Sequence, residues 1–274
     1  MRIGVVNYLN SKPLVYGLER AGGDVRLLFD LPSRLANSLS EGRLDVALIP
    51  CVEFFRTPGY SIVSDACVAC RGPVLSVKLH FRVPPREVRR VALDEGSRTS
   101  AALTKILLAE VCGVKPNWEP LPIGSGFEAT DADAVLLIGD RAIQSSVDPV
   151  TTREFVEVWD LGERWCEWTG LPFVFAMWIA RQGIDTSAIV RLLSFARDEG
   201  IRHLAGIAAK EAHALGITTD VATRYLRDNL HFTLGGKERQ GLFRFYELCV
   251  KHDLAPRGLA RSIEESLADG CPAL

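Results

Sequence analysis

The chain has 274 residues, of which 47% are hydrophobic and 24% charged, and its formal net charge at pH 7 is -2. This length and composition predict a folded globular protein with a core large enough for one large or two modest domains. The balanced charge gives no basic field for nucleic acid or an anionic membrane, so neither is expected as a partner. The longest uncharged apolar run, residues 171–180, is too short for a membrane-spanning helix, which needs about 20 residues.

The first residues and the cysteines indicate a cellular compartment. MRIGVV lacks the charged-then-apolar pattern of a secretory signal and leads directly into polar residues. The seven cysteines are odd in number and scattered, unlike the dense even sets of secreted disulfide-rich domains. Cys67 and Cys70 form a C-x-x-C pair, but they stand in a strand-like run without a second pair, which favours structural thiols over a redox or zinc site. We expect a cytoplasmic protein with reduced thiols.

The first part of the chain alternates strand-like and helix-like segments. Runs rich in β-branched residues and leucine predict strands in RIGVVN, DVRLLFD and DVALIP, and the intervening residues 11–23 and 31–43 have helical spacing with glycine near their ends. This order predicts a parallel sheet, whose ligands bind beyond the carboxyl ends of the strands. The first strand ends in NYLN, residues 7–10, so these side chains are candidates to face a ligand.

A second α/β unit follows a proline pair at residues 84–85. It contains a strand in VRRVALDE, a helix from Arg98 to Cys112 closed by Gly113, a weak strand near NWEPLPI and an apolar strand in DAVLLIG. The apolar strand in LPFVFAMWIA marks the return to the first unit. The segments after it have helical spacing.

These units predict an α/β clamshell of two lobes with a helical C-terminal portion. We expect residues 1–86 with 181–274 to form the first lobe together with the C-terminal helices, and residues 87–180 to form the second lobe. A cleft between two such lobes favours a small-molecule ligand.

The stretch DEGSRTSAAL predicts a helix whose start carries several hydroxyl groups. Free N–H groups and the positive end of the helix dipole bind anions, and Ser97, Thr99 and Ser100 would add side-chain donors. Arg98 would add a positive charge. Ordinary capping by Ser97 explains the same residues without a ligand, and the spacing alone does not decide between the two interpretations.

Two further strand ends carry candidate residues. Ser11 is predicted to cap a helix in which Pro13 takes the first turn, and Asn10, just outside this cap, would either stabilise the turn or contact a ligand. In AVLLIGDRAI, Gly139 would let a ligand approach the backbone and Asp140 would bind a hydroxyl group. The alternative for Asp140 is to cap the following helix.

The common motifs of other chemistries are missing from the sequence. The five histidines show no metal-binding spacing, and no G-x-S-x-G, P-loop or G-x-G-x-x-G after a strand occurs. We therefore expect neither a metal nor another cofactor.

Six segments, taken together and in order, resemble one family over essentially the whole chain: NYLNSKPLVYGL, DVALIPCVEF, RGPVLSV, DEGSRTSAAL, AVLLIGDRA and WCEWTGLPFVFA. The chain is similar to the chorismate dehydratases of the futalosine route to menaquinone. The resemblance implies a periplasmic-binding-protein type II fold, in agreement with the clamshell. It also implies a soluble enzyme that binds chorismate between the lobes and eliminates water to give 3-[(1-carboxyvinyl)oxy]benzoate.

The resemblance also implies roles for individual residues. Asn10 matches the active-site asparagine of the family, and Thr99 with Ser100 matches the polar helix start that holds a substrate carboxylate. Ser76 and Pro50 match the lining of the cleft.

Two alternatives remain at this point. A sister family, the cyclic-futalosine-cleaving naphthoate synthases, resembles the same scaffold but has a histidine base where this sequence has Gly139, which favours the dehydratase branch. A non-catalytic carboxylate-binding protein on the same scaffold is the other alternative, and the lack of an export signal counts against it.

The residues suggest a mechanistic hypothesis for such a reaction. Because chorismate carries two carboxylates, two helix N-termini facing each other, at Ser11 and Ser97, are predicted to bind it. The motifs offer no His, Glu or Lys suited to act as the base, so the enolpyruvyl carboxylate of the substrate would take the proton, held in reach by Asn10. Donors at the ring carboxylate would stabilise the developing enolate.

Overall fold

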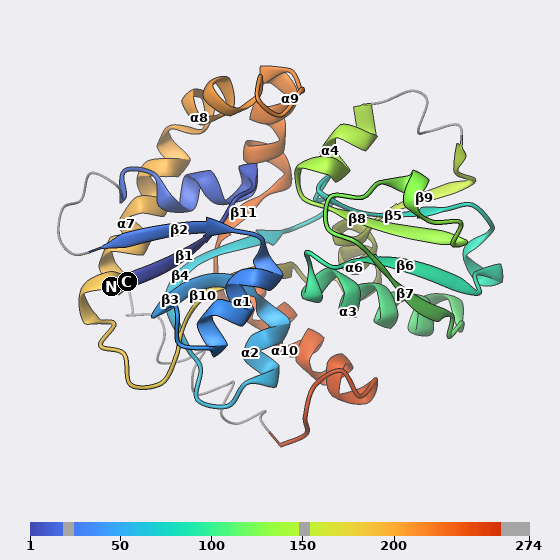
Figure 1. The fold of residues 1–274 in the computed structure, drawn as a ribbon, viewed down its shortest axis with the longest axis horizontal. Helices are drawn as coiled ribbons and strands as arrows, with labels where there is room; N and C mark the ends of the chain where they lie inside the picture. Colours follow the sequence, from blue (N-terminus) through green and yellow to red (C-terminus); the bar gives the residue numbers. More distant parts are fainter. Residues whose placement is uncertain (19–24, 148–153, 259–274) are drawn as a thin grey trace.

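The structure, a computed structural model, describes residues 1–18, 25–147 and 154–258. Its strands form two sheets, one in each lobe (Figure 1). The first sheet contains β1 (Arg2–Val6), β2 (Arg26–Asp30), β3 (Val46–Pro50), β4 (Ser61–Cys70), β10 (Phe173–Ala180) and β11 (His231–Thr233). The second contains β5 (Val77–Phe81), β6 (Arg90–Asp94), β7 (Asn117–Leu121), β8 (Ala134–Ile138) and β9 (Glu157–Asp160).

The strand order confirms the predicted parallel start of the chain. The first sheet has the order β11-β4-β10-β3-β1-β2, and β1 pairs in parallel with both β2 and β3. β10 runs antiparallel between β3 and β4. The second sheet has the order β7-β6-β8-β5-β9, in which β6 pairs in parallel with β7 and β8. The carboxyl ends of β1, β3, β6 and β8 therefore lie at the sheet edges that can face a ligand.

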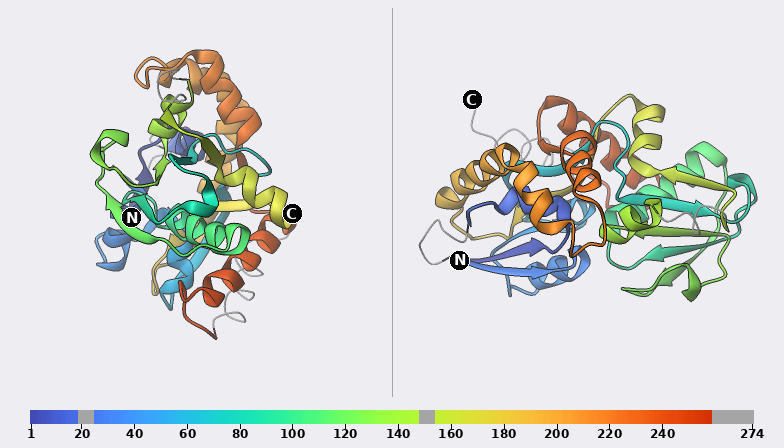
Figure 2. Two further views of the ribbon diagram at one scale, coloured as in Figure 1. Left: turned by 90° about the vertical axis from the view of Figure 1, so that its right-hand side faces the viewer. Right: turned by 90° about the horizontal axis from the view of Figure 1, so that it is seen from above.

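The boundaries of the lobes differ from the predicted 86/87 and 180/181. β5 pairs with β8 and β9, so it belongs to the second lobe although it precedes the prolines, and β10 belongs to the first sheet. The chain crosses between the lobes within residues 71–76 and 161–172. Figure 2 shows the two lobes from the side and from above. The prolines only end β5 and begin a short turn, because a pattern break shows where a strand stops and not which sheet it joins.

Helices cover both faces of the first sheet (Figure 1). In the first lobe these are the 3-10 helix η1 (Leu9–Val15), α1 (Pro32–Ser40) and α2 (Cys51–Arg56). The second lobe and the second crossing contain η3 (Pro85–Glu87), α3 (Arg98–Leu107), the π-helical turn η4 (Leu108–Cys112), η5 (Phe127–Ala129), α4 (Asp140–Val147) and α6 (Leu161–Thr169). The C-terminal portion contains α7 (Ser187–Arg202), α8 (Leu204–Glu211), α9 (Thr219–Arg224), the π-helical turn η6 (Tyr225–Asn229) and α10 (Gly236–Lys251).

Local signals predicted the helix after β6 correctly. Ser97 is its N-cap and accepts a hydrogen bond from the backbone N–H of Ser100, and Gly113 ends it in the left-handed conformation with φ 72°. The segment after β1 is different, because residues 9–15 form a 3-10 helix that contains Pro13. The rest of the predicted helix, residues 19–23, lies outside the described residues.

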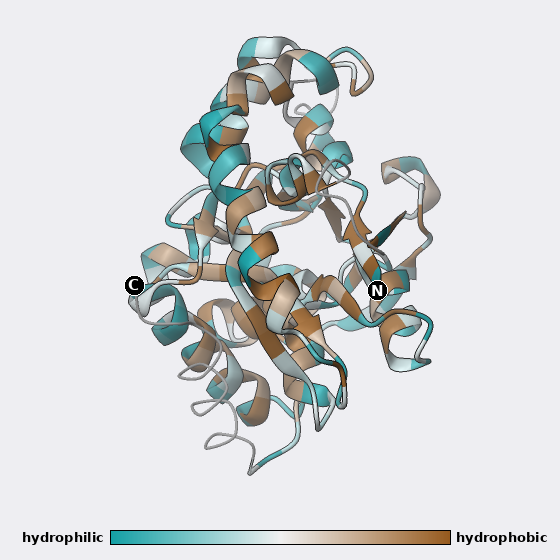
Figure 3. Cartoon of the chain, turned by 90° about the vertical axis from the view of Figure 1, so that its left-hand side faces the viewer, coloured by the Kyte–Doolittle hydropathy of each residue, from teal (hydrophilic) through white to brown (hydrophobic). Residues whose placement is uncertain are grey.

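The core follows the sheets. All residues of β3 and β8 are buried, and the apolar character of the strands against polar outer helix faces is visible in Figure 3. The largest fully buried side chains include Trp165, Trp178 and Tyr225. Cys67 and Cys70 are wholly buried in β4. In the described part of the chain, no helix is long and apolar enough to span a membrane.

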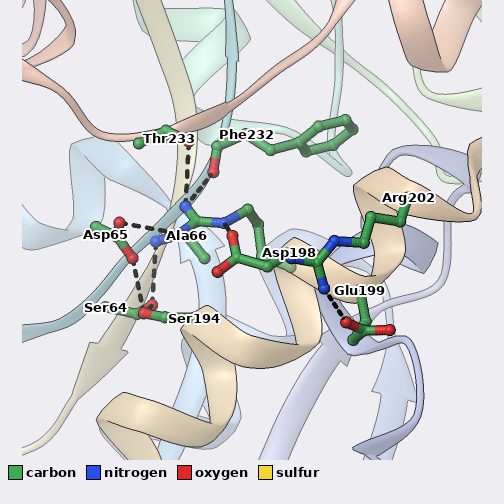
Figure 4. Close-up of polar contacts among 10 residues, drawn as sticks. Ser64, Asp65, Ala66, Ser194, Asp198, Glu199, Arg202, Phe232 and Thr233 are labelled. Carbon is green, nitrogen blue, oxygen red and sulfur yellow. Dashed lines mark hydrogen bonds and ion pairs between the residues drawn. The ribbon is translucent and has the colours of Figure 1, made fainter.

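A buried arginine fixes the C-terminal portion to the first sheet. The guanidinium of Arg197 in α7 pairs with Asp65 of β4 at 3.0 Å and donates to the carbonyl oxygen of Phe232 in β11 at 3.3 Å. Asp65 also accepts from the Ser194 hydroxyl at 2.7 Å (Figure 4). Because both partners are largely buried, this network holds α7, β4 and β11 as one rigid unit.

Candidate functional site

A pocket lies between the two lobes, where the carboxyl ends of β1, β3 and β8 meet. Its cavity volume is about 50 Å³, so the two lobes leave little free space between them. It is lined by Val6, Tyr8, Asn10, Pro32, Pro50, Val68, Val74, Ser76, Val77, Ser97, Ser100, Ile138, Gly139, Phe175 and Ala176. The residues Val6, Pro50 and Ile138 are the last of their strands, which is where open α/β sheets bind ligands.

A larger hollow of about 420 Å³ lies on the first lobe, between η1, β2 and α8. Lys12, Phe29 and His203 border it, and β2 is the only described strand that contributes to its lining. The pocket between the lobes is the better candidate, because apolar walls and several converging polar groups are typical of small-molecule sites.

Two predicted polar residues, Asn10 and Ser76, line this pocket together. Asn10 is half-buried in η1 of the first lobe, and Ser76 is buried in the first crossing, just before β5. The backbone carbonyl of Ser76 accepts a hydrogen bond from the N–H of Gly139 at 2.8 Å. This bond places the crossing segment beside the end of β8, so residues distant in the sequence form one wall.

The start of α3 contributes Ser97 and Ser100 to the pocket. The Ser97 hydroxyl donates to the Ser100 hydroxyl at 2.8 Å and accepts from the Ser100 backbone N–H at 3.2 Å. The positive end of the α3 dipole therefore borders the pocket behind two hydroxyl groups. This arrangement suits a carboxylate.

Thr99 and Arg98, predicted as ligand contacts, instead connect the lobes. The Thr99 hydroxyl accepts from the backbone N–H of Val52 in α2 at 3.3 Å. The Arg98 guanidinium donates to Glu53 at 2.9 Å and to Asn37 at 2.6 Å, both in helices of the first lobe. Neither side chain lines the pocket, because successive helical residues point in different directions and only Ser97 and Ser100 share the pocket face.

Ser11 also differs from its predicted role. It is fully buried within η1, and its single O–H proton is shared between the backbone carbonyls of Val6 and Tyr8, the latter at 2.9 Å. It caps no helix, since η1 begins at Leu9. The hydroxyl instead secures the turn that follows β1 and is not available to a ligand.

The Asp140 side chain likewise contacts another part of the chain and does not line the pocket. Its carboxylate accepts from the backbone N–H of Leu9 at 3.1 Å, so an acid of the second lobe occupies the start of η1 in the first. Burial raises the pKa of Asp140 to about 6, partly offset by this hydrogen bond. The predicted pair of opposed, open helix ends is therefore wrong at the η1 end, where a carboxylate of the chain already stands.

Tyr8 closes the pocket against Gly139. A Cβ atom built on Gly139 would lie 2.8 Å from the Tyr8 ring, and Gly139 has φ +65°. Only glycine fits both the conformation and the approach of the ring. What approaches the backbone of Gly139 in this structure is thus a side chain of the other lobe.

The Tyr8 hydroxyl reaches toward a buried ion pair of the second lobe. It lies near Gly96, and Asp94 beside it pairs with Arg141 and accepts from the Gly96 N–H at 2.9 Å. Burial, and then the negative charge of Asp94, raise the pKa of Tyr8 above its ordinary value. Tyr8 is therefore uncharged at neutral pH.

The lining carries no charged side chain. Of its residues, Tyr8 alone is titratable, so no carboxylate, imidazole or amine of the lining can take a proton. Within the described part of the chain, no cluster of three or more His, Cys, Asp or Glu side chains is arranged to hold a metal ion. The polar groups available to a ligand are an amide and hydroxyls.

The sequence analysis missed Phe175 and Tyr225, and it included Tyr8 only as one of the residues 7–10 at the end of the first strand. The Tyr225 hydroxyl, at the start of η6, faces the side chains of Asn10 and Ser76 from behind the pocket wall. Tyr8 lies just past the end of β1, and this position is the sequence signal that marks it. Nothing local marks Tyr225, because its partners lie far away in the sequence.

Comparisons with known proteins identify the family and the fold. A family model described as menaquinone biosynthesis matches residues 1–251. The chain is 35% identical to a chorismate dehydratase of Thermus thermophilus, over 89% of this chain and 93% of that protein. It is 25% identical to a chorismate dehydratase of Campylobacter jejuni, over 93% of this chain and all of that protein.

Among solved structures, the periplasmic aliphatic sulphonate binding protein of Escherichia coli resembles the chain with a TM-score of 0.63 at 14% identity. The alignment covers 96% of this chain and 90% of the other. The likeness confirms a clamshell of the periplasmic-binding-protein type. At this level of identity it carries no information about the ligand.

Proposed function

The chain belongs to the menaquinone-biosynthesis family, and we propose that it is a chorismate dehydratase, a hydro-lyase that converts chorismate to 3-[(1-carboxyvinyl)oxy]benzoate and water. The 35% identical relative supports this reaction, since the match extends over nearly the whole of both chains. Gly139 supports it further, because a glycine cannot supply the base of the sister synthases.

The observation that carries the proposal is the uncharged lining of the pocket. An elimination of water begins with loss of a proton, here from the ring carbon that bears the enolpyruvyl ether. The lining offers no carboxylate, imidazole or amine for that proton. We therefore assign the proton to the enolpyruvyl carboxylate of the substrate, which is close to it by covalent connection.

Asn10 would hold that carboxylate in place. Its amide provides two N–H donors at the pocket wall, and an amide is too weak a base to compete for the proton. The C–H bond breaks, its electron pair extends through the ring diene to the ring carboxylate, and hydroxide then leaves the neighbouring carbon as the ring becomes aromatic. The leaving hydroxide is balanced by the proton held on the enolpyruvyl carboxylic acid, so the two leave together as one water and the product regains its carboxylate.

The ring carboxylate would bind at the start of α3. Ser97, Ser100 and the positive end of the α3 dipole stabilise negative charge there. Since the charge on this carboxylate grows in the transition state, each preorganised donor lowers the barrier by about 3 kcal/mol. A lining with apolar walls strengthens this effect by excluding water.

The proposed reaction is tested with purified protein and chorismate, without added cofactor. We expect an aromatic ultraviolet absorbance to appear together with a product lighter by one water in the mass spectrum. Asn10→Ala and Asn10→Asp are expected to lose at least about 100-fold in turnover. The exposed Asn117, at the start of β7, provides the matched control, since Asn117→Ala leaves the pocket intact. Near-wild-type turnover of both Asn10 variants would contradict the role of Asn10.

We further propose that the reaction takes place in the cytoplasm and belongs to the futalosine route to menaquinone. The reduced, scattered cysteines of the sequence support the location. A strain without this protein is expected to regain menaquinone when supplied with 3-[(1-carboxyvinyl)oxy]benzoate. Failure of that supplement, with uptake demonstrated, would count against the place in the route.

A further inference from the structure

Tyr225 ends in a polar atom that the fold leaves without a hydrogen bond. Its side chain is fully buried, and its hydroxyl has no hydrogen-bond partner among the residues that the structure describes. Buried hydroxyl groups are nearly always paired, so an unpaired one calls for an explanation. The hydroxyl lies close enough to Asn10 and Ser76 for both to influence its pKa, although neither contact has the geometry of a hydrogen bond.

Both neighbours of this hydroxyl are lining residues of the pocket, whereas Tyr225 itself is not. It therefore stands behind the wall and cannot touch a ligand directly. Burial raises the pKa of Tyr225, and the negative charges of Asp140 and Asp160 act in the same direction. The hydroxyl keeps its proton at neutral pH and is a hydrogen-bond donor there.

The backbone around Tyr225 is irregular and is anchored to the crossing segment of the pocket wall. Tyr225 is the first residue of the π-helical turn η6, and such turns occur frequently at functional sites. The last residue of η6, Asn229, donates from its side chain to the carbonyl oxygen of Pro73 at 2.9 Å. Pro73 belongs to the crossing segment that also holds Ser76, so η6 is anchored to the wall behind which Tyr225 lies.

We propose that Tyr225 is a positioning residue that sets the orientation of the Asn10 amide when substrate binds. Its hydroxyl donates to the side-chain oxygen of Asn10, which leaves both N–H groups of that amide directed at the substrate carboxylate. The lone pairs of the Tyr225 oxygen remain available to Ser76. Hydrogen bonds between catalytic groups are often long and tighten only when substrate binds. This behaviour accounts for the long contacts of the Tyr225 hydroxyl.

This inference rests on the proposed function and adds a residue to it. Without Tyr225, the Asn10 amide could turn either its oxygen or its nitrogen toward the pocket. An oxygen facing the carboxylate would repel it, so a fixed amide orientation directly favours binding and turnover.

Tyr225→Phe tests the inference, with Tyr246→Phe as the matched control. Tyr246 is buried in the same lobe but donates to the carbonyl oxygen of Pro256 at 3.2 Å and lies outside the pocket lining. Tyr225→Phe is expected to lower kcat/KM on chorismate about tenfold while the melting temperature stays equal or rises, because it removes an unpaired buried hydroxyl. Tyr246→Phe is expected to lower the melting temperature and leave kcat/KM unchanged.

A second measurement separates positioning from a general packing effect. We would titrate 3-[(1-carboxyvinyl)oxy]benzoate into four proteins: wild type, Tyr225→Phe, Asn10→Ala and the double variant. Tyr225→Phe is expected to raise the Kd about fivefold in the wild-type background and less than about twofold in the Asn10→Ala background. An equal rise in both backgrounds, or none in either, would overturn the inference.

The outcomes also distinguish this inference from the proposed function. If wild type turns over chorismate and Tyr225→Phe matches it in kcat/KM and Kd, only the role of Tyr225 is wrong. If wild type neither turns over chorismate nor binds the product, the proposed function fails and the role of Tyr225 fails with it.

Discussion

The two helix starts that border the pocket satisfy their first N–H groups in different ways. At η1, the N–H of Leu9 donates to the carboxylate of Asp140, which belongs to the other lobe. At α3, Ser97 of the same helix caps the N–H of Ser100. A helix end capped by its own residue keeps its geometry whatever the lobes do, whereas an end capped across the cleft depends on their closure. We therefore expect the start of α3 to bind the ligand, whereas the cap at the start of η1 forms only when the lobes are closed.

Other contacts between the lobes agree with this division. The Ser33 N–H at the start of α1 donates to the carbonyl oxygen of Gly96 at 3.2 Å, and Thr99 accepts from Val52. The Tyr8 ring packs on Gly139. The structure thus has the lobes in contact around the pocket, and a substrate enters only if some of these contacts separate.

The largest expected effect is that of Gly139→Ala. The new Cβ would meet the Tyr8 ring at 2.8 Å and would strain a backbone with φ +65°, so the lobes could not close. We expect turnover to fall by at least about 100-fold. Steady-state kinetics on chorismate would measure the loss.

Gly113→Ala is the matched control for that variant. Gly113 shares the positive φ, at +72°, but a Cβ atom built on it would have no atom within 4 Å. The strain there is expected to cost about 1–2 kcal/mol of unfolding free energy and to leave turnover unchanged. Equal activity losses in both variants would show that backbone strain, and not the Tyr8 contact, is responsible.

The contrast between Ser97 and Ser11 shows how far local sequence signals reach. The helix from about Arg98 to Cys112 was predicted correctly, as α3 with η4, because its N-cap serine and its final glycine act within their own helix. Ser11 has the same residue type after a strand, yet its hydroxyl bonds to the preceding turn. Residue type and spacing cannot distinguish a serine that caps from one that is drawn into a 3-10 turn.

Apart from Ser11, most of the missing parts of the prediction depend on contacts between distant residues. Asp140 caps Leu9 across 131 positions of sequence, and Tyr225 faces Asn10 from the C-terminal portion. The predicted lobe boundaries were wrong for the same reason. The residues of β10 have an apolar strand pattern that would be the same in either sheet. Among the lining residues, Asn10 and Gly139 were predicted from their places beside strand ends, whereas Pro50 and Ser76 were predicted from the family resemblance.

The second expected effect is a pH dependence of the free energy of unfolding, which tests the role of Asp140. Burial raises the pKa of Asp140 to about 6 in the folded protein, above the about 3.9 of an unfolded aspartate. The folded state therefore binds the extra proton, and this group's contribution to stability is fully present below pH 4 and is lost as pH rises to 6. The loss is on the order of 3 kcal/mol.

Asp140→Asn removes the titration but keeps an oxygen that accepts from Leu9. Unfolding in urea between pH 4 and 7 would compare the two proteins. Wild type is expected to lose stability relative to Asp140→Asn as pH rises from 4 to 6, and the difference is expected to be constant above about pH 7. A difference that does not change with pH would mean that this carboxylate is not buried at the η1 start.

The third effect separates the two serines. Ser97→Ala removes the α3 cap and a donor of the pocket, so it is expected to cost about 1 kcal/mol of stability and to raise KM several-fold. Ser11→Ala removes a hydrogen bond shared between two backbone carbonyls, so it is expected to cost about 1 kcal/mol and to leave KM unchanged. A rise of KM in Ser11→Ala comparable to that in Ser97→Ala would break the distinction between the two helix starts.

The smallest effect is expected for Arg98→Met. The Arg98 guanidinium joins α3 to Glu53 across the lobes at a partly exposed position, and such pairs contribute less than about 1 kcal/mol. We expect KM to change by less than about threefold, with kcat preserved. A loss of kcat by tenfold or more would place Arg98 at the substrate instead.

The identity of the proton acceptor is tested most directly with a chorismate derivative whose enolpyruvyl carboxylate alone is esterified. If that carboxylate takes the proton, the ester is expected to show at least about 1000-fold slower formation of the aromatic product than chorismate, even at saturating concentration. Turnover of the ester within about tenfold of chorismate would contradict the account, because the proton would then have to go to a group of the protein.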